Sequence, residues 1–179
     1  ALSDSGAPPV IGMHVRQGDA CEDAQRTARS CSPLADYMVH ARAVRRATGA
    51  ATIYLATDSP SVLEEAKAYE GEFRFVRSTA AMDAMDRAIA NAKGHRVKPR
   101  DPTHHSANWD DILQYNHKNG NEGDNMDIAW ETTVDVFLLS LCDVFIGKHT
   151  SNVFRTAYEL HASRCHCAAP FVSLDAPWC

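Results

Sequence analysis

The sequence lacks several features that would define its class at once. No apolar stretch approaches the roughly 20 residues needed to cross a bilayer, and no secretory signal peptide is visible. No Gly-x-Gly-x-x-Gly follows the first expected strand, which argues against an unrelated dinucleotide-binding enzyme. Positive charge is in deficit: 18 Lys and Arg face 23 Asp and Glu, giving a formal net charge of -5. That balance argues against a nucleic-acid partner.

Length and composition indicate an ordinary globular domain. The 179 residues, 45% hydrophobic and 23% charged, suffice for a sizeable core, so we expect one domain over residues 1–179. The chain begins with Ala1 rather than Met, and we therefore expect a processed product or a fragment of a longer protein.

Expected strands and helices alternate along the chain. The strands are expected over residues 10–16, 52–57, 73–76, 143–147 and 171–174. The helices are expected over 33–48, after the cap at 58–60, and over 80–93, 127–142 and 151–161. For the first helix, Ser32 is the expected N-cap with Pro33 in first position, and Gly49 is the expected stop. This alternation predicts an α/β fold with a Rossmann-like parallel sheet sandwiched by helices, in which strands 10–15, 52–56 and 144–146 lie together.

One segment, at about 94–126, does not fit the alternation. It is polar and contains His104, His105 and His117, which invite a metal hypothesis. Its composition favours a solvated insertion over a metal site.

The first expected strand carries the strongest local signal for a ligand. The apolar run of residues 10–15 delivers His14, Arg16 and Asp19 to its C-terminal end, where open α/β sheets bind ligands. An Arg presents a planar fork of donors that fits a phosphate, although a surface Arg is the simpler interpretation.

Other polar residues lie where they could join this site. Asp58 either caps the following helix or faces the crevice, and Ser151 is an N-cap at a helix start that could also bind an anion. Asp135 lies on an apolar helix face and needs a partner, either a nucleotide donor or a buried Arg. Glu22 and Asp23 follow the first strand, where a general base is needed.

The six cysteines form two local clusters plus Cys142. An even count in clusters favours a secretory-pathway protein with about two disulfides, and Cys142 in an apolar run is expected to be a buried free thiol. The triplet Cys165-His166-Cys167 suggests zinc, but its spacing is not that of common zinc sites.

Several segments, in order, resemble the nucleotide-binding half of the α1,6-fucosyltransferases of the N-glycan core and their relatives in the GT-B fucosyltransferase group. Residues 9–19, PVIGMHVRQGD, are similar to that family's His-x-Arg-Arg-x-Asp strand motif. The further similar segments are residues 34–40, 54–60 with 64–67, 135–143, 150–151 with 155–159, and 172–175. Together they extend over most of the chain.

The resemblance implies a transferase that moves fucose from GDP-fucose to a glycan or glycoprotein acceptor, with inversion and without a divalent metal. It implies that Arg16 binds the pyrophosphate, with Asp19 orienting Arg16 or the sugar, that Asp135 reads the guanine or ribose edge, and that Ser151 reaches the phosphates. The full set of implied donor-site positions is His14, Arg16, Tyr37, Asp58, Asp135, Thr150, Ser151 and Asn152. It also implies a Golgi-lumenal or secreted protein and an acceptor domain ahead of Ala1.

The chain departs from the family pattern next to the motif. Gln17 stands where a second Arg is common, and Ala20 replaces a basic residue. Residues 20–32 form a longer loop, so the general base is assigned to Glu22 or Asp23. Two function classes remain open: a catalytic transferase, which the site residues favour, and a non-catalytic domain of the same fold that serves as a binding module or a subunit of an assembly.

The lumenal relatives and the clustering together predict two disulfides. We expect Cys21 to pair with Cys31, and Cys179 to pair with Cys165 or Cys167.

Overall fold

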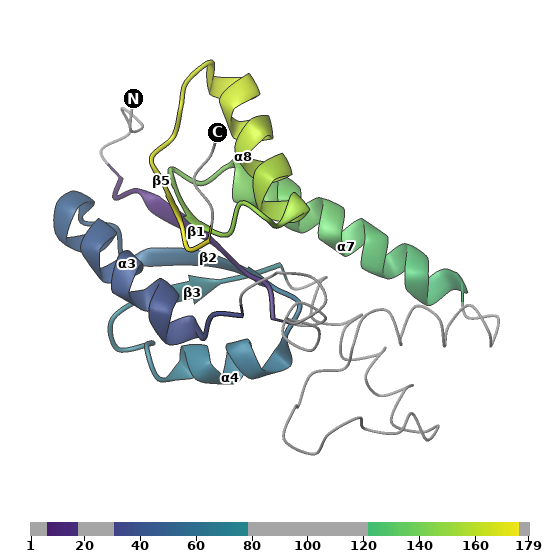
Figure 1. Cartoon of the computed structure of the whole chain (residues 1–179), viewed down its shortest axis with the longest axis horizontal. Coiled ribbons are helices and arrows are strands. Elements are labelled where there is room, and N and C mark those ends of the chain that lie inside the picture. The colour runs from purple at the N-terminus through teal and green to yellow at the C-terminus, as the bar shows by residue number, and fades with distance from the viewer. Residues whose placement is uncertain (1–6, 18–30, 79–121, 176–179) are drawn as a thin grey trace.

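The sheet is parallel and five-stranded. The computed structural model describes residues 7–17, 31–78 and 122–175 (Figure 1). The strands are β1 (Val10–Val15), β2 (Thr52–Thr57), β3 (Arg74–Val76), β4 (Val144–Gly147) and β5 (Phe171–Ser173), in the order β3-β2-β1-β4-β5. Every neighbouring pair is parallel, which confirms the predicted α/β class and the central grouping of β1, β2 and β4.

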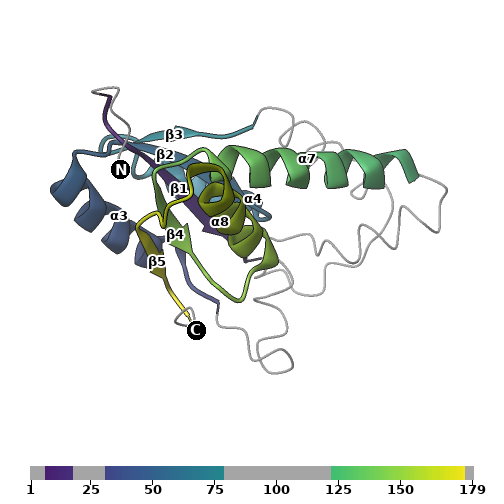
Figure 2. The same ribbon diagram turned by 90° about the horizontal axis from the view of Figure 1, so that it is seen from above.

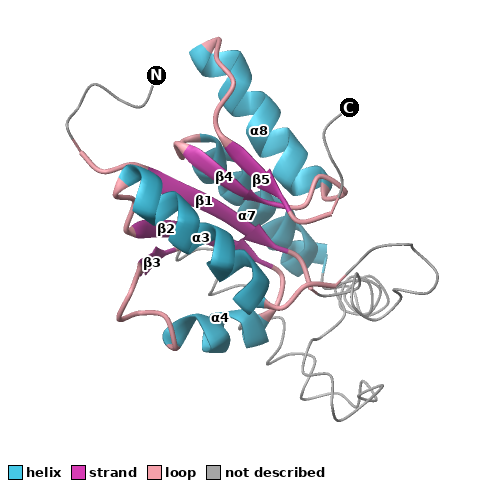
Figure 3. Ribbon diagram, turned by 60° about the vertical axis from the view of Figure 1, so that its left-hand side comes forward, coloured by secondary structure: helices cyan, strands magenta, loops and turns pink. Residues whose placement is uncertain are grey.

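The described helices cover both faces of the sheet in three layers (Figure 3). Helices α3 (Leu34–Thr48) and α4 (Pro60–Lys67) pack on one face, and α7 (Glu122–Ser140) and α8 (Asn152–Cys165) pack on the other. The N-terminal part of α7 runs past the sheet (Figure 2). Among the described residues, no helix combines the length and apolar character required to cross a membrane.

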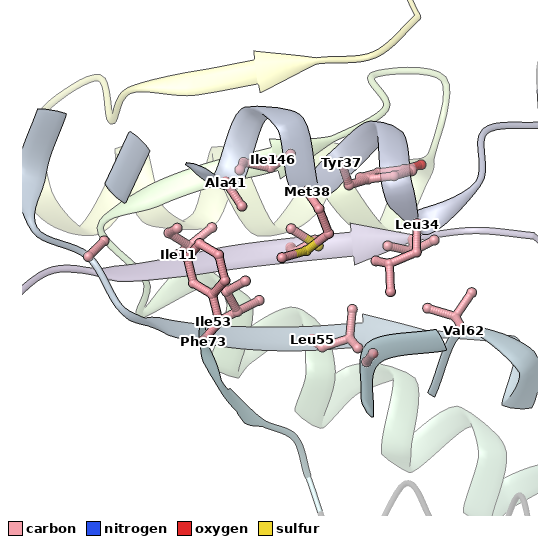
Figure 4. Close-up of a cluster of buried hydrophobic side chains, with 14 residues drawn as sticks. Ile11, Leu34, Tyr37, Met38, Ala41, Ile53, Leu55, Val62, Phe73 and Ile146 are labelled. Atoms are coloured by element: carbon pink, nitrogen blue, oxygen red, sulfur yellow. The ribbon is translucent and has the colours of Figure 1, made fainter. Parts of the chain in front are cut away.

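Alternation along β1 builds two separate cores. Ile11, Met13 and Val15 point toward α3 and α4, where they join Leu34, Tyr37, Met38, Ile53, Leu55, Val62, Phe73 and others (Figure 4). Gly12 points the other way, because a Cβ there would lie 2.9 Å from the Cβ of Cys142 on the α7 side. The second core contains Tyr54, Leu139, Phe145 and Phe154. A strand buried on both faces explains why residues 10–15 are an almost continuous apolar run.

The strand register brings the C-terminal ends of β1, β2 and β4 to one edge of the sheet. Val15 lies opposite Thr57 of β2, and Met13 lies opposite Ile146 of β4. The chain order reverses between β1 and β4, which is the topological switch point where open α/β sheets bind ligands. The C-terminal ends of β1, β2 and β4 therefore lie side by side, and we call this side of the sheet the C-terminal edge.

Several predicted boundaries are wrong; α8, for example, ends at Cys165 rather than at residue 161. Pro33, not Ser32, is the N-cap of α3, with an extended φ/ψ of -66° and 157°, and its carbonyl accepts the Asp36 N–H at 3.1 Å. Helix α7 begins at Glu122 rather than at 127, so the predicted polar loop does not reach 126. Gly49 ends α3 in the left-handed conformation, as expected. The expected helix over 80–93 and the rest of the polar segment lie outside the described residues.

The cysteines partly follow the prediction. Cys142 is a buried free thiol, as expected, and burial raises its pKa to about 12, with Asp143 adding to the shift. Cys165 and Cys167 pair with each other, so the predicted bond from either to Cys179 is wrong. Cys31 is disulfide-bonded. Its predicted partner Cys21 lies outside the described residues, and that pairing stays a prediction.

The contact between Gly147 and Phe154 generates the first testable prediction. A Cβ at Gly147 would lie 2.2 Å from the Phe154 ring, so Gly147→Ala must displace a buried aromatic side chain. We expect a loss of about 1–3 kcal/mol in the free energy of unfolding, measured by urea denaturation. Gly71→Ala is the matched control, since nothing lies within 4 Å of a Cβ there. An equal loss in both variants would contradict the packing argument.

Candidate functional site

The ends of β1 and β2 are tied together by Asp58. Its Oδ1 accepts the backbone N–H of Gln17 at 2.9 Å, and Thr57 Oγ1 donates to the Val15 carbonyl at 2.7 Å. Ser59, not Asp58, is the N-cap of α4. Of the two interpretations of Asp58, the structure therefore supports the one in which it faces the C-terminal edge.

The loop from β4 to α8 is organised by a carboxylate from beyond β5. Asp175 Oδ1 accepts the His149 N–H at 2.9 Å, and Oδ2 accepts the Thr150 N–H at 3.3 Å and the Thr150 hydroxyl. Ser173 Oγ donates to Asp175 Oδ1 at 2.9 Å. The N–H groups of this loop, which the sequence suggested for phosphate, thus already hold an internal anion.

The buried polar atoms without a hydrogen-bond partner in the described part of the chain include His14 Nδ1, Tyr37 OH and Ser151 Oγ. They come from β1, the first turns of α3 and the N-cap of α8, which are elements that reach the C-terminal edge. In Figure 4 the hydroxyl of Tyr37 points along β1 toward its C-terminal end. Buried polar groups are satisfied in nearly all proteins, so each of these atoms indicates a position where a polar ligand can bind. By alternation along β1, His14 faces the α7 side of the sheet with Gly12, whereas Tyr37 lies on the α3 side.

His14 and Tyr37 present neutral groups. Burial lowers the pKa of His14 to about 3, and the charge of Arg16 adds to that shift. Burial raises the pKa of Tyr37, and the nearby carboxylates of Asp175 and Asp58 raise it further. At neutral pH both side chains can therefore give or accept hydrogen bonds without carrying charge.

Two cations stand at the ends of the central strands. Arg16 follows β1 and is half-buried, while Lys148 follows β4 and is buried. Burial lowers the pKa of Lys148, although Asp175 and Asp36 partly oppose that effect. Sequence analysis missed Lys148, yet its signal was the same as that of Arg16: a cation directly after an apolar strand.

Asp135 lies on α7 and is hydrogen-bonded to a tyrosine of β2. Its Oδ1 accepts the hydroxyl of Tyr54 at 2.6 Å, and burial nevertheless raises its pKa. Tyr54 lies three residues before the end of β2, or about 10 Å along the strand. The described partner of Asp135 is therefore a core tyrosine rather than an Arg, and its contact with a nucleotide stays a prediction.

The remaining predicted residues divide into two groups. Thr150 and Asn152 are exposed at the start of α8; Thr150 binds Asp175, and Asn152 Oδ1 accepts from Arg155. Asp19, Glu22 and Asp23 lie outside the described residues, so their roles stay predictions.

The sequence matches no known protein-family model. What the site can bind is therefore inferred from its own residues. Two cations, two neutral hydrogen-bonding side chains and a helix start at one edge can bind a polyanion and stabilise charge that develops on it.

The two buried tyrosines generate a paired prediction. Tyr37→Phe removes a hydroxyl with no described partner, so we expect the free energy of unfolding to stay within about 0.5 kcal/mol or to rise. Tyr54→Phe leaves the buried Asp135 carboxylate without its donor, and we expect a loss of about 1–3 kcal/mol. Urea denaturation of both variants measures this. A larger loss for Tyr37→Phe would show that its hydroxyl is bound within the protein.

The depressed pKa of His14 predicts a specific pH dependence. Below its ordinary value of 6.5 the unfolded chain binds a proton that the folded protein refuses down to about pH 3, so stability falls as pH falls through that window. From about pH 6.5 to about pH 5 the expected loss is about 2 kcal/mol. His14→Gln should flatten this slope in urea denaturation, whereas His40→Gln, on α3, should keep it. Equal slopes for wild type and His14→Gln would refute the assignment.

Proposed function

We propose that the chain is the donor-binding domain of a glycosyltransferase of the GT-B fucosyltransferase type, which holds GDP-fucose at the C-terminal edge and transfers fucose to a glycan or glycoprotein. The supporting observation is the set of unpartnered buried atoms of His14, Tyr37 and Ser151, accompanied there by Arg16 and Lys148. The strand order is also that of doubly wound nucleotide-binding folds.

The two cations suit the leaving group of such a reaction. When an acceptor hydroxyl attacks the anomeric carbon, the bond to the β-phosphate breaks and negative charge grows on the departing diphosphate. Arg16 and Lys148 lie at the ends of adjacent strands, where their charges would stabilise that growth. Ser151 Oγ and Tyr37 OH would donate hydrogen bonds to the phosphates or the sugar. Glu22 or Asp23 would take the acceptor proton.

Base recognition rests on the family resemblance alone. The Oδ1 of Asp135 already accepts the Tyr54 hydroxyl, so contact between Asp135 and guanine rests on the resemblance. The lumenal or secreted location is likewise part of the proposal, supported by the disulfide bonds of Cys31, Cys165 and Cys167.

One observation favours the second candidate, a binding module that does not transfer sugar. Gln17, at the position of the family's second Arg, donates from Nε2 to the Ser32 carbonyl at 3.1 Å. Its side chain is therefore engaged with the chain before α3 instead of supplying a cation to a phosphate. A domain with one fewer cation retains binding more readily than catalysis.

Calorimetry with GDP, UDP and ADP, without metal and then with magnesium, tests the donor site. We expect GDP to bind best, and Arg16→Ala to lose roughly 2–4 kcal/mol of binding free energy because a charge-assisted contact disappears from a half-buried position. Arg46→Ala is the matched control, since Arg46 is exposed at the far end of α3. Equal affinity for the three nucleotides, or no effect of Arg16→Ala, would refute the proposal.

Fucosyl transfer, followed in a longer form that also carries the acceptor domain implied by the resemblance, distinguishes the two candidates. Gln17→Arg, which restores the family's second cation, is expected to raise GDP affinity or turnover of GDP-fucose, followed as release of GDP. Tight GDP binding without turnover in either form would identify the binding module.

A further inference from the structure

Three metal-ligating side chains gather at the C-terminal end of α8, the opposite end of that helix from its N-cap Ser151. The ligand atoms of His161, Cys165 and Cys167 all lie within 4.8 Å of one another. His161 and Cys165 are four residues apart on α8, hence on one face, and Cys167 returns past the helix end after the left-handed residue His166. Sequence analysis considered only the two cysteines with His166 and missed His161.

The imidazole of His161 is oriented for a ligand. Its Nδ1 lies 3.0 Å from the Ser140 carbonyl, and its Nε2 lies 3.8 Å from Cys167 Sγ. Because a carbonyl only accepts, Nδ1 carries the proton and Nε2 presents its lone pair toward the sulfur. Metal-binding histidines are fixed in this way by a carbonyl behind the ring.

The two sulfurs are joined as a disulfide in this structure, with Cys165 exposed and Cys167 half-buried. A dithiol reductant would break this bond by supplying two electrons and two protons, and would itself leave as a disulfide. The two thiols would then lie at a helix C-terminus, where the helix dipole disfavours thiolates and favours a cation. Two thiolates at that position are stable only when a cation neutralises them.

We propose that reduction of Cys165–Cys167 creates a zinc site whose protein ligands are the two sulfurs and His161 Nε2. Zn²⁺ displaces the two thiol protons, forms two Zn–S bonds and one Zn–N bond, and takes water in the fourth position. Tetrahedral zinc with Zn–S of about 2.3 Å places ligand atoms about 3.5–3.8 Å apart. The distance from His161 Nε2 to Cys167 Sγ already has this value, and the two sulfurs must separate once their bond is broken.

The experiment compares zinc uptake by the whole chain before and after reduction with a phosphine, under argon. Bound zinc is measured by competition with a chromogenic chelator, and cobalt substitution reports sulfur ligation through its charge-transfer absorption. The other cysteines can also bind zinc once reduced, so the double variant Cys165→Ser/Cys167→Ser sets the background. We expect reduced wild type to bind one zinc more than this double variant, and the oxidised protein to bind none here.

Single histidine variants test the third ligand without altering either sulfur. His161→Ala should weaken the extra zinc at least about tenfold, whereas His166→Ala should leave it unchanged. Equal zinc uptake by reduced wild type and the double variant would overturn the proposal. So would an unchanged affinity in His161→Ala, or a cobalt spectrum without sulfur charge transfer.

Discussion

The burial of β1 on both faces is the constraint on which the rest of the structure depends. Ile11, Met13 and Val15 fill one core, and the absence of a side chain at Gly12 leaves room for Leu139 and Cys142 on the other face. A strand buried in this way pairs on both sides, which fixes β2 and β4 as its neighbours. The first residues free of this packing are those after Val15, so polar chemistry begins abruptly at the C-terminal edge.

Charge at that edge is largely balanced from within. Asp58 holds the backbone after β1, and Asp175 holds the backbone after β4. These carboxylates position the two loops before any ligand arrives, and they lie among the cations Arg16 and Lys148. A diphosphate at this edge would compete with Asp175 for the donors of the β4–α8 loop. Asp175 therefore both fixes the β4–α8 loop and occupies the N–H groups that a diphosphate would need.

Sequence reasoning recovered what depends on periodicity. Apolar runs predicted the strands, and apolar residues at helical spacing predicted the helices that follow Pro33 and Ser151. These patterns follow directly from burial, and their alternation predicted a parallel sheet in which β1, β2 and β4 lie together. The hydrogen-bond partners of side chains could not be predicted in the same way. Tyr54 and Asp135 are 81 residues apart, and nothing local indicates that one satisfies the other.

The same distinction applies to the candidate site. His14 and Arg16 were found because a polar residue in or after an apolar strand is visible in the sequence. Asp175 was missed as the residue that orders the β4–α8 loop, since its bonds to residues 149 and 150 bridge about 25 positions. The predicted bond to Cys179 failed for a related reason: clustering showed which cysteines lie near one another in the sequence, but not that Cys165 would pair with Cys167 across a left-handed residue.

The contact between Gly147 and Phe154 has a consequence for evolution. Gly147 is the last residue of the strand that leads into the candidate site, and the Phe154 ring occupies the space that any side chain there would need. A residue with a side chain at position 147 requires a smaller residue at position 154, because the Phe154 ring fills that space. Among relatives the two positions should therefore change together, and their covariation would reveal the pairing of β4 with α8 in any alignment of this family.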